Sequence, residues 1–234
     1  MTSSIKAIIF DCDGTLVDSE ESHLSAWQKV ASNYTSTLSH EDYIQFVGGS
    51  DSSLSNILAK RIGHNSPNEL LIQKRDYFLE YLHGGLPPII ETVKFVRELF
   101  KDRESHGLKL AVASAALKYE VLTNLKTLGF ENAFDIVLSG HDDLNDYSDP
   151  EGVNKPKPYI YLHTAKLLGL SPSECIVIED SHTGVTAGVN AGCFTIAIPN
   201  AFSKTHDLSR AALTLESLSG FTIQSFLEIV HKLL

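Results

Sequence analysis

The chain has little cysteine. Its three cysteines, Cys12, Cys175 and Cys193, form no Cys-x-x-Cys pair, so the sequence indicates neither a disulfide framework nor a zinc site. A cysteine-based phosphatase carries an arginine at a fixed short spacing after its nucleophile, and none of the three cysteines has one there. That class of enzyme is excluded, and we interpret the three thiols as small core side chains.

Long apolar runs and positive charge are also scarce. No stretch approaches the roughly 18 apolar residues of a membrane span, and the N-terminus lacks the charged-then-apolar pattern of a signal peptide. The net charge of −10 argues against a nucleic-acid backbone or an anionic membrane as partner. We therefore expect a cytoplasmic protein that binds neither.

The composition that remains suits a globular protein. With 43% hydrophobic and 21% charged residues, the chain can bury a sizeable core. Its 234 residues fit one large domain or a core with a smaller insertion.

The most informative segment runs from Phe10 to Ser19. An apolar run over 5–10 predicts a buried strand, which ends on Asp11 and Asp13 before a glycine that permits a sharp turn. Ligands bind at the carboxyl ends of the strands in a parallel sheet. Two carboxylates there can share a cation, or one can attack a substrate while the other transfers a proton. Taken alone, the pair also fits an ordinary polar turn.

Strand-like and helix-like segments alternate through the C-terminal two-thirds of the chain. Apolar runs predict four further strands, at 108–113, 134–138, 175–178 and 194–198. Helical periodicity lies between them, at 119–128, at 159–168 and from Thr183 onward. This alternation predicts a parallel α/β sheet.

The segment from about residue 18 to residue 85 breaks this rhythm. It has helical patterns at 22–31, 54–62 and 70–82, but no convincing strand. We therefore predict a helical insertion directly after the first strand. Two connections, near Val17 and near Leu86, would let such a cap pivot over the carboxylates.

Two further polar signals follow this pattern. Ser114 comes directly after the strand at 108–113, where its hydroxyl and nearby backbone N–H groups can hold a phosphoryl oxygen, although a helix N-cap is the plainer interpretation. Lys155 begins a Lys-Pro-x-Pro turn, which would hold it rigidly. Its charge can offset that of a transferring phosphoryl group, whereas Lys157 is interpreted as a solvated charge.

The last signal is Glu179-Asp180, which ends the strand at 175–178. Facing Asp11 and Asp13, these acids would complete an oxygen-rich pocket suited to octahedral Mg²⁺. An acidic protein that handles phosphate needs such a local cation. Glycines at a spacing of four follow on one face of the next predicted helix, where they would allow close packing on the sheet: Gly184, Gly188 and Gly192.

In order, and each at a strand end, these four motifs resemble those of the haloacid dehalogenase-like superfamily over essentially the whole chain. The likeness is closest to members with a small helical cap after the first motif, the group of β-phosphoglucomutase and many sugar-phosphate phosphatases. It implies an α/β fold: a Rossmann-like, doubly wound parallel sheet core at 1–16 and 87–234, with a small inserted α-helical cap at 17–86. It also implies Mg²⁺ dependence and an aspartyl-phosphate intermediate.

The resemblance implies roles for the residues of the first motif. Asp11 matches the nucleophile and a metal ligand. Asp13 matches the general acid and base, and lends its carbonyl to the metal. Dehalogenating and phosphonate-cleaving members lack this second acid, so Asp13 favours phosphate esters.

The later motifs are assigned in the same way. Ser114 and the amide of Ala115 would bind the phosphoryl group, and Lys155 would neutralise the nucleophile and the phosphate. Asp180 is the expected further metal ligand, with Glu179 as a less certain one.

The cap is expected to contact the substrate through His23, Gly49, Ser50 and Lys74. His23 resembles a histidine that helps gate proton transfer in β-phosphoglucomutase. Lys74 or Arg75 could supply a cap cation, and an ordinary charge on a helix surface is an equally good interpretation of either. Asp51 stands where that mutase has a cap arginine, and Leu117 replaces its lysine. A mutase must hold two phosphates, so we favour a phosphatase, with a phosphosugar mutase as the alternative.

The sequence thus predicts an enzyme that hydrolyses a small phosphomonoester, with a sugar phosphate as the leading class. Its partner is a small phosphorylated metabolite, and a monomer is the default expectation. A catalytically silent binding module is the remote alternative, because neither a catalytic acid nor the lysine is lost. The acidic connection at 141–154 is interpreted as a solvated loop, with a role at the mouth of the site or in holding a cation as the alternative.

Overall fold

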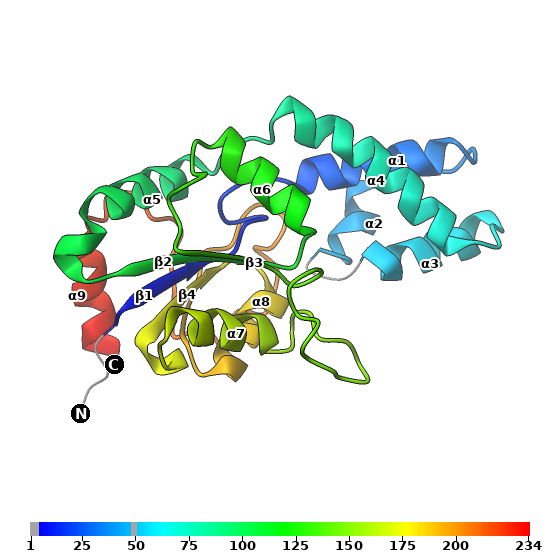
Figure 1. The fold of residues 1–234 in the computed structure, drawn as a ribbon. Helices are drawn as coiled ribbons and strands as arrows, with labels where there is room; N and C mark the ends of the chain where they lie inside the picture. Colours follow the sequence, from blue (N-terminus) through cyan, green and yellow to red (C-terminus); the bar gives the residue numbers. More distant parts are fainter. Residues whose placement is uncertain (1–4, 48–50) are drawn as a thin grey trace.

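A parallel sheet of six strands forms the centre of the protein in a computed structural model, which describes residues 5–47 and 51–234 (Figure 1). The strand order is β3-β2-β1-β4-β5-β6, and every pairing between them is parallel. The strands are β1 (Ala7–Phe10), β2 (Lys109–Ser114), β3 (Ile136–Ser139), β4 (Cys175–Glu179), β5 (Phe194–Ala197) and β6 (Leu213–Thr214). The predicted α/β fold is confirmed, and only β6 was not expected. The order reverses beside β1, where doubly wound sheets bind ligands.

Helices cover both faces of the sheet. In Figure 1, α5 (Ile90–Asp102) and α6 (Lys118–Thr127) lie on one face, and α7 (Tyr159–Leu168) and α8 (His182–Ala191) lie on the other. Ile8 and Phe10 of β1 join the core under α5, α6 and α9 (Ile223–Leu233), while Ala7 and Ile9 join the core under α7 and α8. This alternation follows from the period of two along a strand. Short 3₁₀ helices, η1 (Arg103–His106) and η2 (Pro172–Glu174), precede β2 and β4.

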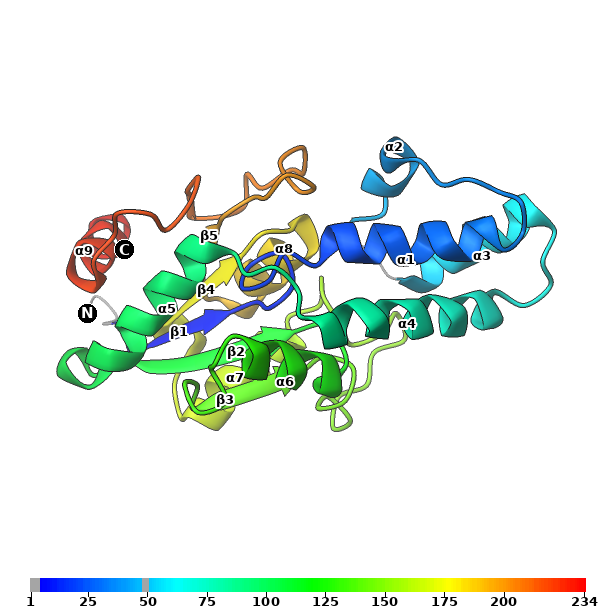
Figure 2. The ribbon, with the colours of Figure 1, turned by 90° about the horizontal axis from the view of Figure 1, so that it is seen from above.

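Four helices lie together at the carboxyl ends of the strands, to one side of the sheet in Figure 2. They are α1 (Glu20–Ser32), α2 (His40–Ile44), α3 (Asp51–Ile62) and α4 (Pro67–Gly84). Trp27, Leu58 and Leu70 are buried in a cluster that these helices share. The chain enters and leaves this group side by side, with Val17 bridged to Pro88. A cap with boundaries at 17 and 86 stays a prediction, with which this arrangement agrees.

The glycines after β4 behave in two different ways. A Cβ atom on Gly184 would lie 1.9 Å from the Glu179 carboxyl group, and one on Gly188 would lie 2.6 Å from Thr195 Oγ1. These two therefore permit close packing of α8 on the sheet. The prediction was wrong for Gly192, which ends α8 with a φ of 85° and where a Cβ atom would make an ordinary contact with Pro172 at 3.9 Å.

The cysteines and the apolar runs can be compared with the structure over residues 5–47 and 51–234. All three cysteines are buried and free, as expected of core side chains. No helix in 5–47 or 51–234 is long and apolar enough to span a bilayer.

Candidate active site

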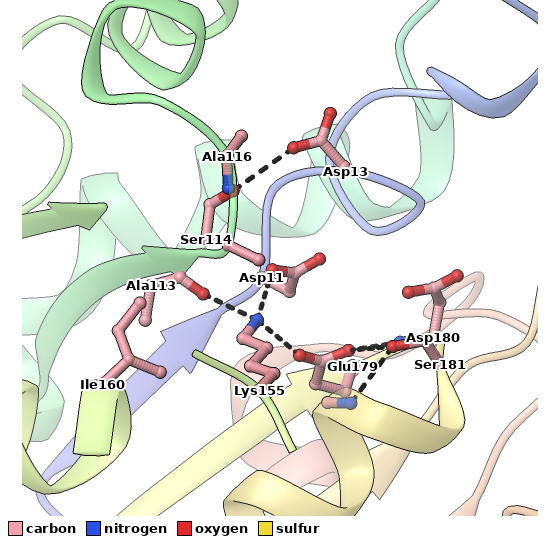
Figure 3. Close-up of polar contacts among 12 residues, drawn as sticks. Asp11, Asp13, Ala113, Ser114, Ala116, Lys155, Ile160, Glu179, Asp180 and Ser181 are labelled. Carbon is pink, nitrogen blue, oxygen red and sulfur yellow. Dashed lines mark hydrogen bonds and ion pairs between the residues drawn. The ribbon is translucent and has the colours of Figure 1, made fainter. Parts of the chain in front are cut away.

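Lys155 lies between two buried carboxylates at the carboxyl ends of the central strands. Phe10 pairs with Val112 and with Ile178, so the next residue, Asp11, comes level with Ala113 and Glu179. The Lys155 ammonium donates to Asp11 Oδ1 at 2.6 Å, to Glu179 Oε1 at 2.6 Å and to the Ala113 carbonyl at 2.9 Å (Figure 3).

This cluster is almost closed to solvent. The Lys155, Asp11 and Glu179 side chains are 5%, 8% and 0% exposed. All three N–H groups of the ammonium have acceptors, as a buried cation requires.

Ser114 lies close to the second aspartate of the first motif. Its Oγ donates to Asp13 Oδ2 at 3.2 Å and accepts from the Ala116 amide at 3.1 Å (Figure 3). Helix α6 begins later, at Lys118, so Ser114 is not its N-cap. The plainer interpretation of this serine was therefore wrong, and its hydroxyl faces the acid instead.

Asp11, Glu179 and Asp180 form a group that can hold a metal ion. One ligand atom from each lies within 4.8 Å of the others, and all three residues are buried. Lys155 supplies one positive charge against three carboxylates, so a divalent cation would restore charge balance. Oxygen donors of this kind suit a hard cation such as Mg²⁺.

Neighbouring polar groups hold Glu179, the last residue of β4, and Asp180, which follows it, in different ways. Glu179 Oε1 accepts from Lys155 and from Tyr161 Oη at 2.6 Å, and its Oε2 accepts from the Asp180 amide and Ser181 Oγ at 3.2 Å each. Asp180 Oδ2 accepts from Asn200 Nδ2 at 2.9 Å. Both Glu179 oxygens are thus engaged, which makes Asp180 the freer ligand.

Burial dominates the electrostatics of the acids. It raises the pKa of Asp11 to about 8, with Glu179 and Asp13 adding to the rise and Lys155 opposing it. It also raises the pKa of Asp180 well above the usual range, together with the charges of Glu179 and Asp11. The pKa of Asp13 is raised by burial as well. A divalent cation would favour the ionised forms.

A cavity of about 770 Å³ lies over these residues, between the sheet and the four helices α1 to α4. The end of the cavity at the sheet is lined by Asp11, Asp13, Ser114, Ala115, Lys155 and Asp180. This volume is within the roughly 300–1,000 Å³ of small-molecule sites. His23 and Lys74 also line it, whereas Gly49 and Ser50 lie outside the described residues.

His23 and Lys74 belong to one hydrogen-bonded network, in which the Lys74 side chain is 2% exposed and that of Asp51 is 40% exposed. Lys74 Nζ donates to His23 Nδ1 at 2.7 Å and to Asp51 Oδ2 at 2.6 Å. The His23 ring stacks on Phe78 at a centroid distance of 4.0 Å. Burial and the Lys74 charge lower the pKa of His23 to about 3, so the ring is neutral at physiological pH.

The connection at 141–154 is more than a solvated loop. His141, Glu151 and Asn154 line the cavity, and Asn154 Nδ2 donates to the Ala115 carbonyl at 3.1 Å. Lys157 pairs with Glu151 at 2.6 Å and with Asp149 at 3.4 Å, and it also lines the cavity, so it is more than the solvated charge that was expected.

Sequence reasoning missed several polar residues at the site. Asn200 could have been predicted, because it follows β5 closely, just as the other predicted site residues follow their strands. Tyr161 and Asn154 carried no comparable signal. Neither did Glu20, whose carboxylate lines the cavity and accepts from Tyr43 Oη at 2.7 Å.

Known proteins resemble this chain along nearly its whole length. The sequence model of a family described as haloacid dehalogenase-like hydrolase matches residues 8–198. The "Phosphorylated carbohydrates phosphatase" of Thermotoga maritima is 28% identical, over 91% of each chain. "Hexitol phosphatase A" of Escherichia coli is 29% identical, over 93% of this chain and 94% of its own. A crystal structure of β-phosphoglucomutase from Clostridium difficile matches with a TM-score of 0.76 and 25% identity, over 97% of both chains.

Proposed function

The chain belongs to the haloacid dehalogenase-like hydrolase family, and from this premise we propose that it is a Mg²⁺-dependent phosphatase of a small phosphorylated carbohydrate. One observation carries the proposal: Asp11, Asp13, Ser114, Lys155 and Asp180 all line one end of a single cavity. The names of two similar proteins, a phosphorylated carbohydrates phosphatase and a hexitol phosphatase, support the substrate class.

The first step of the proposed reaction joins Asp11 to phosphorus. Lys155 holds Asp11 Oδ1, so Oδ2 is the oxygen free to attack in line. The bond from phosphorus to the ester oxygen breaks, and Asp13 gives its proton to the leaving alcohol. A pKa raised by burial favours the protonated Asp13 that this step requires.

In the second step water hydrolyses the aspartyl phosphate, so that the bond from Asp11 to phosphorus breaks and Asp11 is released. Asp13, now ionised, takes a proton from water, whose oxygen attacks the phosphorus of the aspartyl phosphate. Phosphate leaves, and both aspartates regain their starting states. Ser114 and the amide of Ala115 would hold the phosphoryl oxygens, and Lys155 would offset their charge.

The metal would be held by Asp11, Asp180 and the carbonyl of Asp13. Glu179 is better suited to positioning Lys155, because its oxygens already have partners. When bound, Mg²⁺ supplies positive charge to the carboxylates and the phosphoryl oxygens.

A phosphosugar mutase is the second candidate, favoured by the likeness to β-phosphoglucomutase. A mutase must hold a second phosphate in the cap, and two features oppose this. Asp51 and Leu117 stand at positions where cations would be needed, and Lys74 is already paired.

A panel of phosphomonoesters with Mg²⁺ tests the proposal, with free phosphate and glucose 6-phosphate both measured. The panel includes β-glucose 1-phosphate. Free phosphate released from sugar phosphates is the expected result. Glucose 6-phosphate formed without free phosphate would replace the phosphatase with the mutase, and no product from any ester would favour a silent binding module.

A further inference from the structure

Carboxylates from three helices surround the cap half of the cavity. They are Glu20 of α1, Asp51 of α3 and Glu120 of α6. Two cations from α4, Lys74 and Arg75, line the same half. Among the described residues the acidic side chains here outnumber the cations by three to two, in contrast to the cation-rich wall that a second phosphate would need.

Asp51 removes Lys74 from the set of available cations. The two side chains form an ion pair at 2.6 Å, and that of Lys74 is only 2% exposed. Trp27 Nε1 donates to Asp51 Oδ1 at 3.0 Å and so fixes the carboxylate toward the lysine. A second N–H of the ammonium is taken by His23 Nδ1 at 2.7 Å. The positive charge is therefore neutralised within the wall.

The other two carboxylates keep acceptor capacity for a ligand. Glu20 accepts one hydrogen bond from Tyr43 Oη, and Glu120 accepts one from the Leu117 amide at 3.2 Å. A carboxyl group keeps acceptor capacity in either protonation state, so both can accept further bonds from hydroxyl groups. Sugar hydroxyls supply such donors, whereas a second phosphate presents only acceptors and about two negative charges.

We propose that Asp51 is a specificity-determining residue, which neutralises Lys74 so that the cavity selects monophosphates with an uncharged polyol end and discriminates against bisphosphates. This rests on the proposed function for the placement of the reacting phosphate beside Asp11. Like charges brought together across a binding surface are strongly unfavourable, and this repulsion supplies the discrimination.

Binding measurements test this without turnover. Fructose 6-phosphate and fructose 1,6-bisphosphate are titrated calorimetrically, with Mg²⁺, into proteins that also carry Asp11→Asn. The readout is the ratio of the two dissociation constants. Because charge is the cause, Asp51→Asn should shift this ratio toward the bisphosphate by about 10-fold, and Lys74→Met should shift it the other way.

Two matched variants separate charge from structure. The double variant Asp51→Asn/Lys74→Met has no net change of charge, so its ratio should return to within about 3-fold of the parent. Asp51→Glu keeps the carboxylate and should retain the parent's preference. Thermal melting of each variant checks that it is folded, and the double variant lacks the unpaired Lys74 charge that Asp51→Asn would leave buried.

Three results would overturn the proposal. The parent protein could prefer the bisphosphate, Asp51→Asn could leave the ratio unchanged, or Arg75→Gln could abolish a strong affinity for the bisphosphate. This last result would show that Arg75, and not the Asp51–Lys74 pair, determines how the far end of the substrate is recognised. Failure of the proposed function is distinguishable, because it would appear as sugar-phosphate binding by Asp11→Asn proteins without phosphate release by the unmodified enzyme.

Discussion

At the scale of single residues, the site depends on the buried contact between Lys155 and its two acids. Removing one partner from a buried ion pair leaves an uncompensated charge, which costs more than the pair contributes. The 5% exposure of the Lys155 side chain leaves water little access to replace it.

Lys155→Met should therefore lower the free energy of unfolding by about 3–5 kcal/mol, measured by urea denaturation without metal. Mg²⁺ should restore part of the loss, because it offsets the same carboxylates. Lys157→Met is the matched control, since its pair with Glu151 is exposed and is worth at most about 1 kcal/mol. Equal losses in the free energy of unfolding of the two variants would contradict the larger contribution expected from the buried pairs of Lys155.

The ionisation of Glu20 should make the stability of the protein depend on pH. Burial raises its pKa from the usual 4.5 to about 7, against the hydrogen bond from Tyr43. Between these two values the folded chain holds a proton that the unfolded chain has released, so stability falls as pH rises through this window. Glu20→Gln has no such ionisation. Its stability relative to the unmodified protein should increase from pH 4.5 to about 7 and then level off; a difference independent of pH would contradict this.

Residues of the site differ in how far the sequence could predict them. Asp11, Ser114 and Asp180 could be found because a parallel sheet brings the ends of its strands to one edge. The pairing of Lys74 with Asp51 could not, because it depends on how two helices pack, and neither residue type specifies its partner.

At the scale of elements, the approach of α8 to the sheet sets the position of Glu179. Gly184 lies directly behind the Glu179 carboxyl group, and a methyl group there would overlap it. Because α8 lies so close to the sheet, the spacing of its small residues predicted this packing from the sequence. The five-residue α2 and the two-residue β6 are too short for any periodic pattern to predict them.

Gly184→Ala should displace Glu179 and loosen its hold on Lys155. We expect a loss of about 1–3 kcal/mol in the free energy of unfolding from overpacking, together with a lower kcat. Gly84→Ala, at the end of α4 with nothing within 4 Å, is the control and should change neither. Full activity and stability in Gly184→Ala would show that α8 can move aside without consequence.

At the scale of the whole molecule, the fold brings acidic side chains together in a protein whose net charge is already negative. The net charge is −10, and three buried acids, Asp11, Glu179 and Asp180, lie together at the ends of the central strands. A cation bound there would therefore stabilise the whole fold as well as take part in the proposed chemistry.

Mg²⁺ should accordingly raise the melting temperature in a concentration-dependent way, by roughly 5–10 °C at 100 times the dissociation constant. A chelator should reverse the rise. Asp180→Asn should lose most of it, whereas Asp76→Asn, an exposed change on α4, should keep it. A rise of the same size in Asp180→Asn would place the cation elsewhere.

In the proposed reaction, Asp11 attacks phosphorus. The most direct measurement compares phosphate release from a sugar monophosphate by the unmodified protein and by folded Asp11→Asn, both with saturating Mg²⁺. We predict turnover by the first and a loss of at least about 10³-fold in the second, since an amide cannot serve as the nucleophile. Equal rates in the two proteins would contradict the account.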